Sequence, residues 1–154
     1  LFFPMIGAEE EAVEEDDYVS TAHKAAHILV VEDQAQVRDM LQNMFERMGH
    51  RVEVTENASL ALEYLKTNFS SVDVVITDQN MPKITGSEMA EKIEEQWPDI
   101  PIILMSGYSE EKLETILANR DNIKVTLKKP VSKEKMSETL ASILGYEQDE
   151  KQAV

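Results

Sequence analysis

Short apolar runs alternate with amphipathic stretches over most of this chain, and this alternation restricts the fold more than any other feature. Residues 28–31 form a continuous run, Ile-Leu-Val-Val, which is typical of a strand buried on both faces of a sheet. Residues 35–48 follow with apolar side chains at spacings of three and four, which predicts a helix, and Gly49 provides a stop. A strand followed at once by a helix is the unit of parallel sheets.

The unit recurs along the chain. Further strands are predicted from apolar residues within 52–54, 72–77, 100–105 and 123–127. The helical stripes are Ala58, Ala61, Leu62 and Leu65; Met89, Ala90 and Ile93; a weaker one of Leu113, Ile116 and Leu117; and, from about Lys133, Met136, Leu140, Ile143 and Leu144. Strict alternation predicts an α/β fold, a doubly wound five-stranded parallel sheet with right-handed crossovers and helices on both faces.

The charge of the chain is distributed unevenly. The formal net charge is -15, of which residues 1–24 carry -6 and the last nine residues carry -2. Duplex nucleic acid and anionic membrane are therefore poor partners, and the apolar runs are too short to span a bilayer. The absence of cysteine excludes disulfides and thiolate metal sites, which fits a cytoplasmic protein.

Composition also divides the chain. Seven acidic residues between 9 and 17 repel one another, which predicts a disordered acidic linker over 8–26. The alternating pattern defines one domain over 27–145, and 146–154 is a short tail. Because the chain opens at Leu1 without the pattern of a secretory signal, we expect it to be part of a longer protein.

Polar residues follow four of the predicted strands. Glu32 and Asp33 follow the first strand, Asp78 the third, Ser106 the fourth and Lys129 the fifth. In a sheet of order 2-1-3-4-5, counted along the chain, the carboxyl ends of these strands line one crevice, which is where open α/β sheets bind ligands. Three carboxylates at close range repel one another unless a cation lies among them, and oxygen-only ligation favours Mg²⁺. One aspartate could then accept a phosphoryl group beside Mg²⁺ and a lysine.

The segments 28–33, 74–82, 104–107 and 127–130 resemble, in order and spacing, the four signatures of the response regulator receiver domains of two-component signalling. The resemblance covers roughly residues 27–145 and implies a flavodoxin-like fold. It implies that Asp78 is the phosphoacceptor and that Mg²⁺ is held by Glu32, Asp33, Asp78 and the backbone carbonyl of Asn80.

The resemblance extends to the remaining site residues and to the partners. Ser106 matches the hydroxyl residue that moves toward the phosphoryl group, and Lys129 matches the lysine of the family motif, with a cis peptide before Pro130. The implied partner is a histidine kinase or a histidine phosphotransfer domain, and weak dimerisation is an open alternative. At the position where the family often has an aromatic switch residue, this chain has Thr126, which puts signalling through that position in doubt, although Tyr108 is a candidate to take its part.

Residues 1–7 begin with Leu-Phe-Phe-Pro, which resembles the last strand of the ATP-binding domain of histidine kinases. This resemblance implies a hybrid sensor histidine kinase as the parent protein. The alternative is a remnant without structure.

Other interpretations remain open at this stage. Asp33 and Gln36 would also form a capping box, and Lys129 could be an ordinary surface charge. A phosphatase of the haloacid dehalogenase type would need a second aspartate where this chain has Asn80, and a flavin mononucleotide site would be repelled by Glu32 and Asp33. A pseudo-receiver that docks partners without being phosphorylated is the main alternative.

Overall fold

The computed structural model describes residues 25–107, 114–115 and 121–145. Among these residues it has five strands and four helices. In chain order they are β2 (His27–Val31), α2 (Ala35–Arg47), β3 (Arg51–Thr55), α3 (Ala58–Asn68), β4 (Val74–Asp78), α4 (Gly86–Gln96), β5 (Ile102–Ser106), β6 (Ile123–Lys128) and α6 (Lys133–Leu144). Residues 114–115 are also helical, whereas the predicted stripe of Leu113, Ile116 and Leu117 lies outside the described residues.

All neighbouring strands pair in parallel, in the order β3-β2-β4-β5-β6. Counted along the chain this is 2-1-3-4-5, so the predicted flavodoxin-like arrangement is confirmed. In the register, Val31 pairs with Thr77, Asp78 with Met105 and Ser106 with Lys128. Because the strands are parallel, the residues that follow them all lie along one edge of the sheet.

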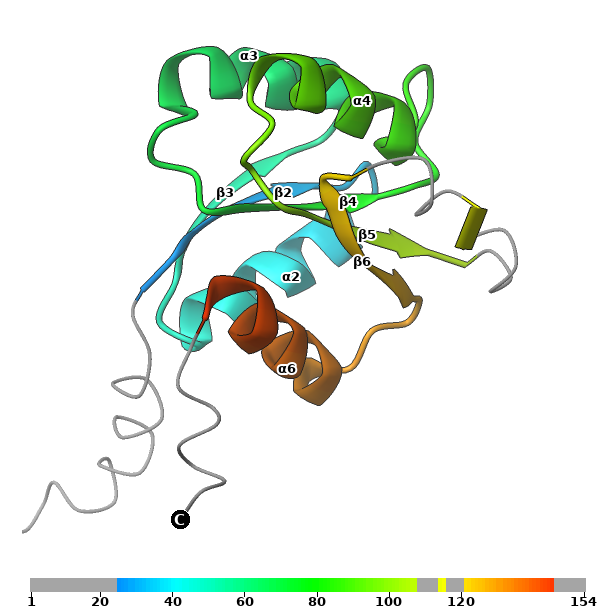
Figure 1. Ribbon diagram of the computed structural model, residues 1–154. Helices are drawn as coiled ribbons and strands as arrows, with labels where there is room; N and C mark the ends of the chain where they lie inside the picture. Colours follow the sequence, from blue (N-terminus) through cyan, green and yellow to red (C-terminus); the bar gives the residue numbers. More distant parts are fainter. Residues whose placement is uncertain (1–24, 108–113, 116–120, 146–154) are drawn as a thin grey trace, which may run out of the picture.

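Helices cover both faces of the sheet (Figure 1). The pair α3 and α4 packs on one face, where Leu29 and Val31 of β2 belong to its apolar cluster. The pair α2 and α6 packs on the other face with Ile28 and Val30. Successive residues of a strand point to opposite faces, so this two-sided burial explains the continuous apolar run of β2.

Local sequence explains several of the helix ends. Thr85 and Glu88 form a capping box at α4, and Gly49 ends α2 with a φ of 94°. At the start of α2 the alternative interpretation of Asp33 and Gln36 as a capping box is wrong, because the N-cap is Gln34 and no side chain caps this helix. The carboxylate of Asp33 lies instead beside the other acids of the crevice.

Two predicted strands begin later than expected. The third begins at Val74 instead of Val72, whose side chain is buried in the core ahead of the ladder. The fourth begins at Ile102 instead of Ile100, because Pro101 has no N–H to donate and only its carbonyl pairs, accepting from Val75 N at 3.0 Å.

No helix of the described ranges combines the length and the apolar character needed to cross a bilayer. The segments 1–7 and 146–154, most of 8–26, and Tyr108 lie outside the described residues, so the domain bounds inferred from the sequence stay a prediction.

Candidate functional site

Three carboxylates meet at the carboxyl edge of the sheet. Glu32 and Asp33 follow β2, and Asp78 ends β4. One oxygen from each of the three lies within 4.8 Å of the other two. Glu32 and Asp78 are buried, whereas Asp33 is partly exposed, so Asp33 is the carboxylate of the cluster that contacts solvent most.

Lys129, which directly follows β6, lies against the three-carboxylate cluster. Its Nζ lies 3.3 Å from Asp78 Oδ1 and 3.7 Å from Glu32 Oε1, and its side chain is only 28% exposed. The backbone N–H of Lys129 donates to the carbonyl of Ser106 at 2.9 Å, and the peptide to Pro130 is cis. Lys129 is therefore not an ordinary surface charge.

The electrostatics of Glu32 are unusual for a glutamate. Burial first, and then the neighbouring Asp78, raise the pKa of this carboxyl. The N–H of Gln34, which donates to Oε2 at 3.2 Å, and Lys129 work in the opposite direction without cancelling the effect. Oε1 accepts no hydrogen bond from any described residue.

The donor set and its burial fit a hard divalent cation. A buried carboxylate oxygen without a hydrogen bond, two further carboxylates and no nitrogen or sulfur donor in the cluster are the surroundings that Mg²⁺ prefers. Such an ion would offset both the burial and the repulsion by Asp78 that raise the pKa of Glu32.

The other predicted site residues lie nearby along the same edge. Ser106 ends β5 and is fully buried, and it directly follows Met105, the pairing partner of Asp78. Asn80 is exposed, and its N–H makes a long contact of 3.4 Å with Asp78 Oδ1. Thr126 is partly buried and pairs with Leu104 in the ladder, on β6, which β5 separates from β4 and its Asp78.

Three residues that contact the site were missed by sequence reasoning. Arg38 on α2 donates from Nη1 to the carbonyl of Glu32 at 2.9 Å. Gln79 is buried directly after Asp78, and Gly86 at the start of α4 lies against the Asp78 carbonyl. Each of the three contacts involves backbone atoms, and such contacts leave no sequence motif. The one signal in the sequence was Gly86, a glycine at the first position of a helix, which indicates close packing there.

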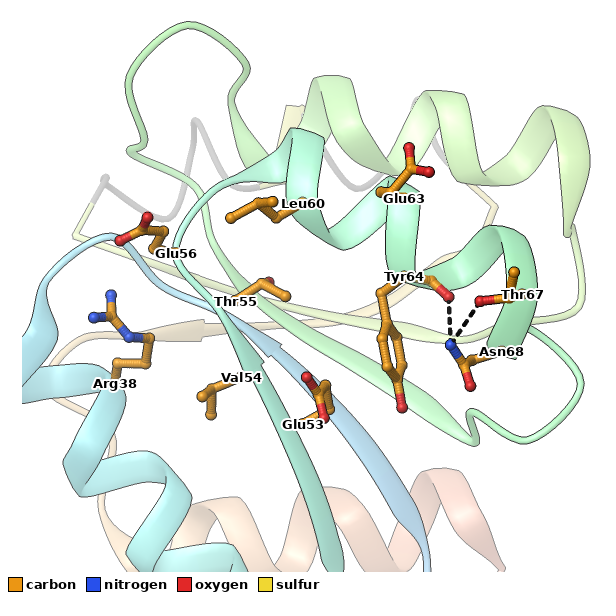
Figure 2. A pocket seen from close by; sticks show the side chains of 10 residues that line it. All are labelled: Arg38, Glu53, Val54, Thr55, Glu56, Leu60, Glu63, Tyr64, Thr67 and Asn68. Carbon is orange, nitrogen blue, oxygen red and sulfur yellow. Dashed lines mark hydrogen bonds between the residues drawn. The ribbon is translucent and has the colours of Figure 1, made fainter.

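A separate groove of about 600 Å³ lies over the edge strand β3 beside α3 (Figure 2). Its lining includes Glu53, Leu60, Tyr64 and Asn68, and Asn68 donates to the Tyr64 carbonyl at 2.9 Å. None of the three clustered carboxylates lines it. Arg38 lines the groove and also contacts the Glu32 carbonyl.

The order of the sheet, with an acidic crevice and a lysine at its carboxyl edge, defines the class of CheY-like receiver folds. The family model described as the response regulator receiver domain matches residues 28–141. This chain belongs to that family, whose members act in two-component signalling with histidine kinases or phosphotransfer partners.

Known relatives agree with this assignment. A chemotaxis protein CheY homolog of Campylobacter jejuni is 31% identical over 120 residues, covering 77% of this chain and 92% of that protein. The 3',5'-cyclic-nucleotide phosphodiesterase regA of Dictyostelium discoideum is 32% identical over 123 residues, covering 76% of this chain but 15% of that protein. The crystal structure of a response regulator receiver domain protein of Clostridium thermocellum superposes with a TM-score of 0.72 at 26% identity, covering 84% of this chain and 99% of that one.

Proposed function

We propose that Asp78 is a phosphoacceptor. A carboxylate oxygen of Asp78 attacks the phosphorus of a phosphohistidine on a kinase or phosphotransfer domain. The new O–P bond forms while the N–P bond breaks, and the electron pair stays on the imidazole nitrogen, which then takes a proton from solvent. The phosphorylated domain signals by a conformational change.

The surrounding residues have distinct roles in this proposal. Glu32, Asp33, Asp78 and the Asn80 backbone carbonyl would hold Mg²⁺, which supplies charge neutralisation for the phosphoryl oxygens. Lys129 provides a second positive charge to a phosphoryl oxygen. Ser106 donates its hydroxyl to another oxygen once the group is on Asp78.

The observation that carries the proposal is the position of Lys129. Lys129 lies 3.3 Å from Asp78, inside a crevice with two further acids. This position is why we propose Asp78, of the thirty acidic residues of the chain, as the acceptor. Lys129 neutralises the acceptor before reaction and stays beside the phosphoryl group afterwards. Neither a turn aspartate nor a solvated lysine would require this arrangement.

The proposal also covers the setting of the reaction. We place it in the cytoplasm, with a histidine kinase or histidine phosphotransfer domain as the donor. The hybrid-kinase parent stays a prediction, because residues 1–7 lie outside the described residues. Weak dimerisation likewise stays a prediction.

Phosphorylation by a small-molecule donor tests the proposal directly. The full chain is incubated with acetyl phosphate and Mg²⁺, and intact mass is followed with time. We expect the mass of one phosphoryl group to be added, and none after Asp78→Asn. Asp121→Asn, which changes an exposed aspartate far from the crevice, should be modified like the unchanged protein. A chain that stays unmodified would favour the pseudo-receiver instead.

A further inference from the structure

Gln79, the residue after the proposed phosphoacceptor, is buried and makes four hydrogen bonds. Only 5% of it is exposed, although glutamine is usually a surface residue. Its backbone N–H donates to the Met105 carbonyl at 2.8 Å, and its backbone carbonyl accepts from Gly86 N at 3.1 Å. Its side chain makes two bonds to Ser87: Oε1 accepts from the backbone N–H at 2.7 Å, and Nε2 donates to Oγ at 3.0 Å.

These contacts close the loop between β4 and α4. Three of the four bonds of Gln79 go to Gly86 and Ser87, the first two residues of α4. Gln79 therefore joins the two ends of the loop over 80–85. The fourth bond fixes Gln79 to β5. Met81, two residues after Gln79, is also held in place. It is 7% exposed and belongs to the core cluster under α3 and α4.

Asn80 therefore lies between two anchored neighbours. Asn80 itself is exposed, and within the described part of the chain its N–H makes only the long contact with Asp78 Oδ1. Anchoring both neighbours restricts the directions that the peptide carbonyl between Asn80 and Met81 can take. A backbone carbonyl that binds a metal ion is oriented by the residues packed and hydrogen-bonded on either side of it.

We propose that Gln79 is a positioning residue that orients the Asn80 backbone carbonyl for Mg²⁺. This inference rests on the proposed function, because it presupposes that the acidic cluster binds the ion. Gln79 does not touch the ion; it acts through the peptide backbone. The competing explanation is that Gln79 only secures the start of α4, as a structural residue would.

The structure offers variants that separate the two explanations. Gln79→Met keeps the length of the side chain and removes both bonds to Ser87. Thr85→Ala removes the side-chain cap of α4 but keeps the bonds of Gln79, so it weakens the helix start alone. Gln96→Met makes the same chemical change as Gln79→Met on an exposed residue at the far end of α4.

Mg²⁺ affinity of the full chain is measured by isothermal titration calorimetry, well below the melting temperature of each variant. Losing a group that supports a metal ligand typically weakens affinity by about 10–100-fold. Because the carbonyl is one ligand among four, we expect about tenfold weaker binding for Gln79→Met. Thr85→Ala and Gln96→Met should bind Mg²⁺ as the unchanged protein does, although Thr85→Ala melts earlier.

A spectroscopic signature tests the backbone route. When Mg²⁺ is added to ¹⁵N-labelled protein, the Met81 amide, which shares its peptide group with the Asn80 carbonyl, should shift. In Gln79→Met that shift should be reduced at saturating Mg²⁺, while the shift of the Gln34 amide beside Glu32 persists.

The outcomes are distinct. If the unchanged protein binds no Mg²⁺, the proposed function fails. If it binds Mg²⁺ and a folded Gln79→Met binds equally well with the same Met81 shift, the role of Gln79 is refuted. If Gln79→Met does not fold, Ser87→Ala replaces it. This variant removes the Oγ that accepts from Gln79 Nε2, together with a 3.4 Å contact to Thr85 Oγ1 that Thr85→Ala also removes. A smaller loss of affinity in Ser87→Ala than expected for Gln79→Met supports the inference, and unchanged affinity refutes it.

Discussion

Gly86 packs directly on the backbone of Asp78. A Cβ atom at Gly86 would lie 2.5 Å from the Asp78 carbonyl oxygen and 2.7 Å from Cδ1 of Leu104. The first turn of α4 can approach the proposed phosphoacceptor this closely only without a side chain. The close spacing between α4 and the carboxyl end of β4 therefore depends on glycine at position 86.

Gly86→Ala should therefore destabilise the fold. The backbone oxygen cannot move aside as a flexible side chain could, and such overpacking costs about 1–3 kcal/mol in the free energy of unfolding. Urea denaturation measures it. Gly107→Ala is the matched control, since a Cβ there meets no atom of the described residues within 4 Å, and it should stay within about 0.5 kcal/mol of the unchanged protein. Equal stability of the two variants would contradict the close packing at Gly86.

Lys129→Met should slow phosphorylation of Asp78 while leaving Mg²⁺ binding in place. The variant removes the ammonium group 3.3 Å from Asp78 but keeps all three carboxylates. Loss of one group that stabilises charge in a transition state costs about 10²–10³ in rate. Intact-mass measurements with acetyl phosphate give that rate. Lys128→Met, at the exposed neighbouring residue, should react normally; a similar loss in both variants would point to a general effect of charge.

Glu32→Gln should stabilise the metal-free protein at neutral pH. Because the folded pKa of Glu32 is raised above 4.5, its contribution to stability is complete below that pH and is lost as the pH rises through the folded value. At neutral pH the buried charge is therefore a net cost, which Gln removes. Thermal unfolding in chelator should show a higher melting temperature for Glu32→Gln.

The same variant should lose the response to Mg²⁺. An ion that binds only the folded state stabilises it by about 2.7 kcal/mol at a hundred times its dissociation constant. The unchanged protein should gain this stability, and Glu32→Gln should gain far less. The control is Glu63→Gln, where the side chain is 69% exposed and forms only a surface ion pair with Lys66. If Mg²⁺ raised the melting temperature of Glu32→Gln as much as that of the control, Glu32 would not be a ligand.

Tyr64 should contribute to stability in a pH-dependent way. Its hydroxyl lies 3.0 Å from Nε2 of the buried His27, and losing this contact in Tyr64→Phe should cost about 1 kcal/mol at neutral pH. Burial first, and then Glu53, raise the pKa of Tyr64 above 10.0. The contribution of Tyr64 is thus complete below that pH and is lost as the pH rises through the folded value.

The stability difference between the unchanged protein and Tyr64→Phe should accordingly narrow in strongly alkaline solution. Urea denaturation at about pH 8 and above about pH 10 measures it. Absorbance of the tyrosinate ion gives an independent check, since Glu53→Gln should lower the alkaline midpoint of Tyr64. A midpoint unaffected by Glu53→Gln would contradict the electrostatic coupling.

Much of the fold could be predicted because its signals are local. The apolar run of β2, the stripe of α2 and Gly49 at the end of that helix all appear in the order in which the structure uses them. The strand starts were less predictable. Val72 is as apolar as a strand residue, and only its position ahead of the ladder separates it from β4.

The sequence by itself determined the strand-helix alternation and the placement of an acid, a hydroxyl or a lysine after particular strands. It could do so because periodicity and strand ends depend on residues close together in the chain. Tertiary structure alone decided that Lys129 lies nearer to Asp78 than to Glu32, that Asp33 joins the acids instead of capping α2, and that Gln79 holds the start of α4. These relationships join atoms brought together by packing across strands and helices, so no local pattern records them.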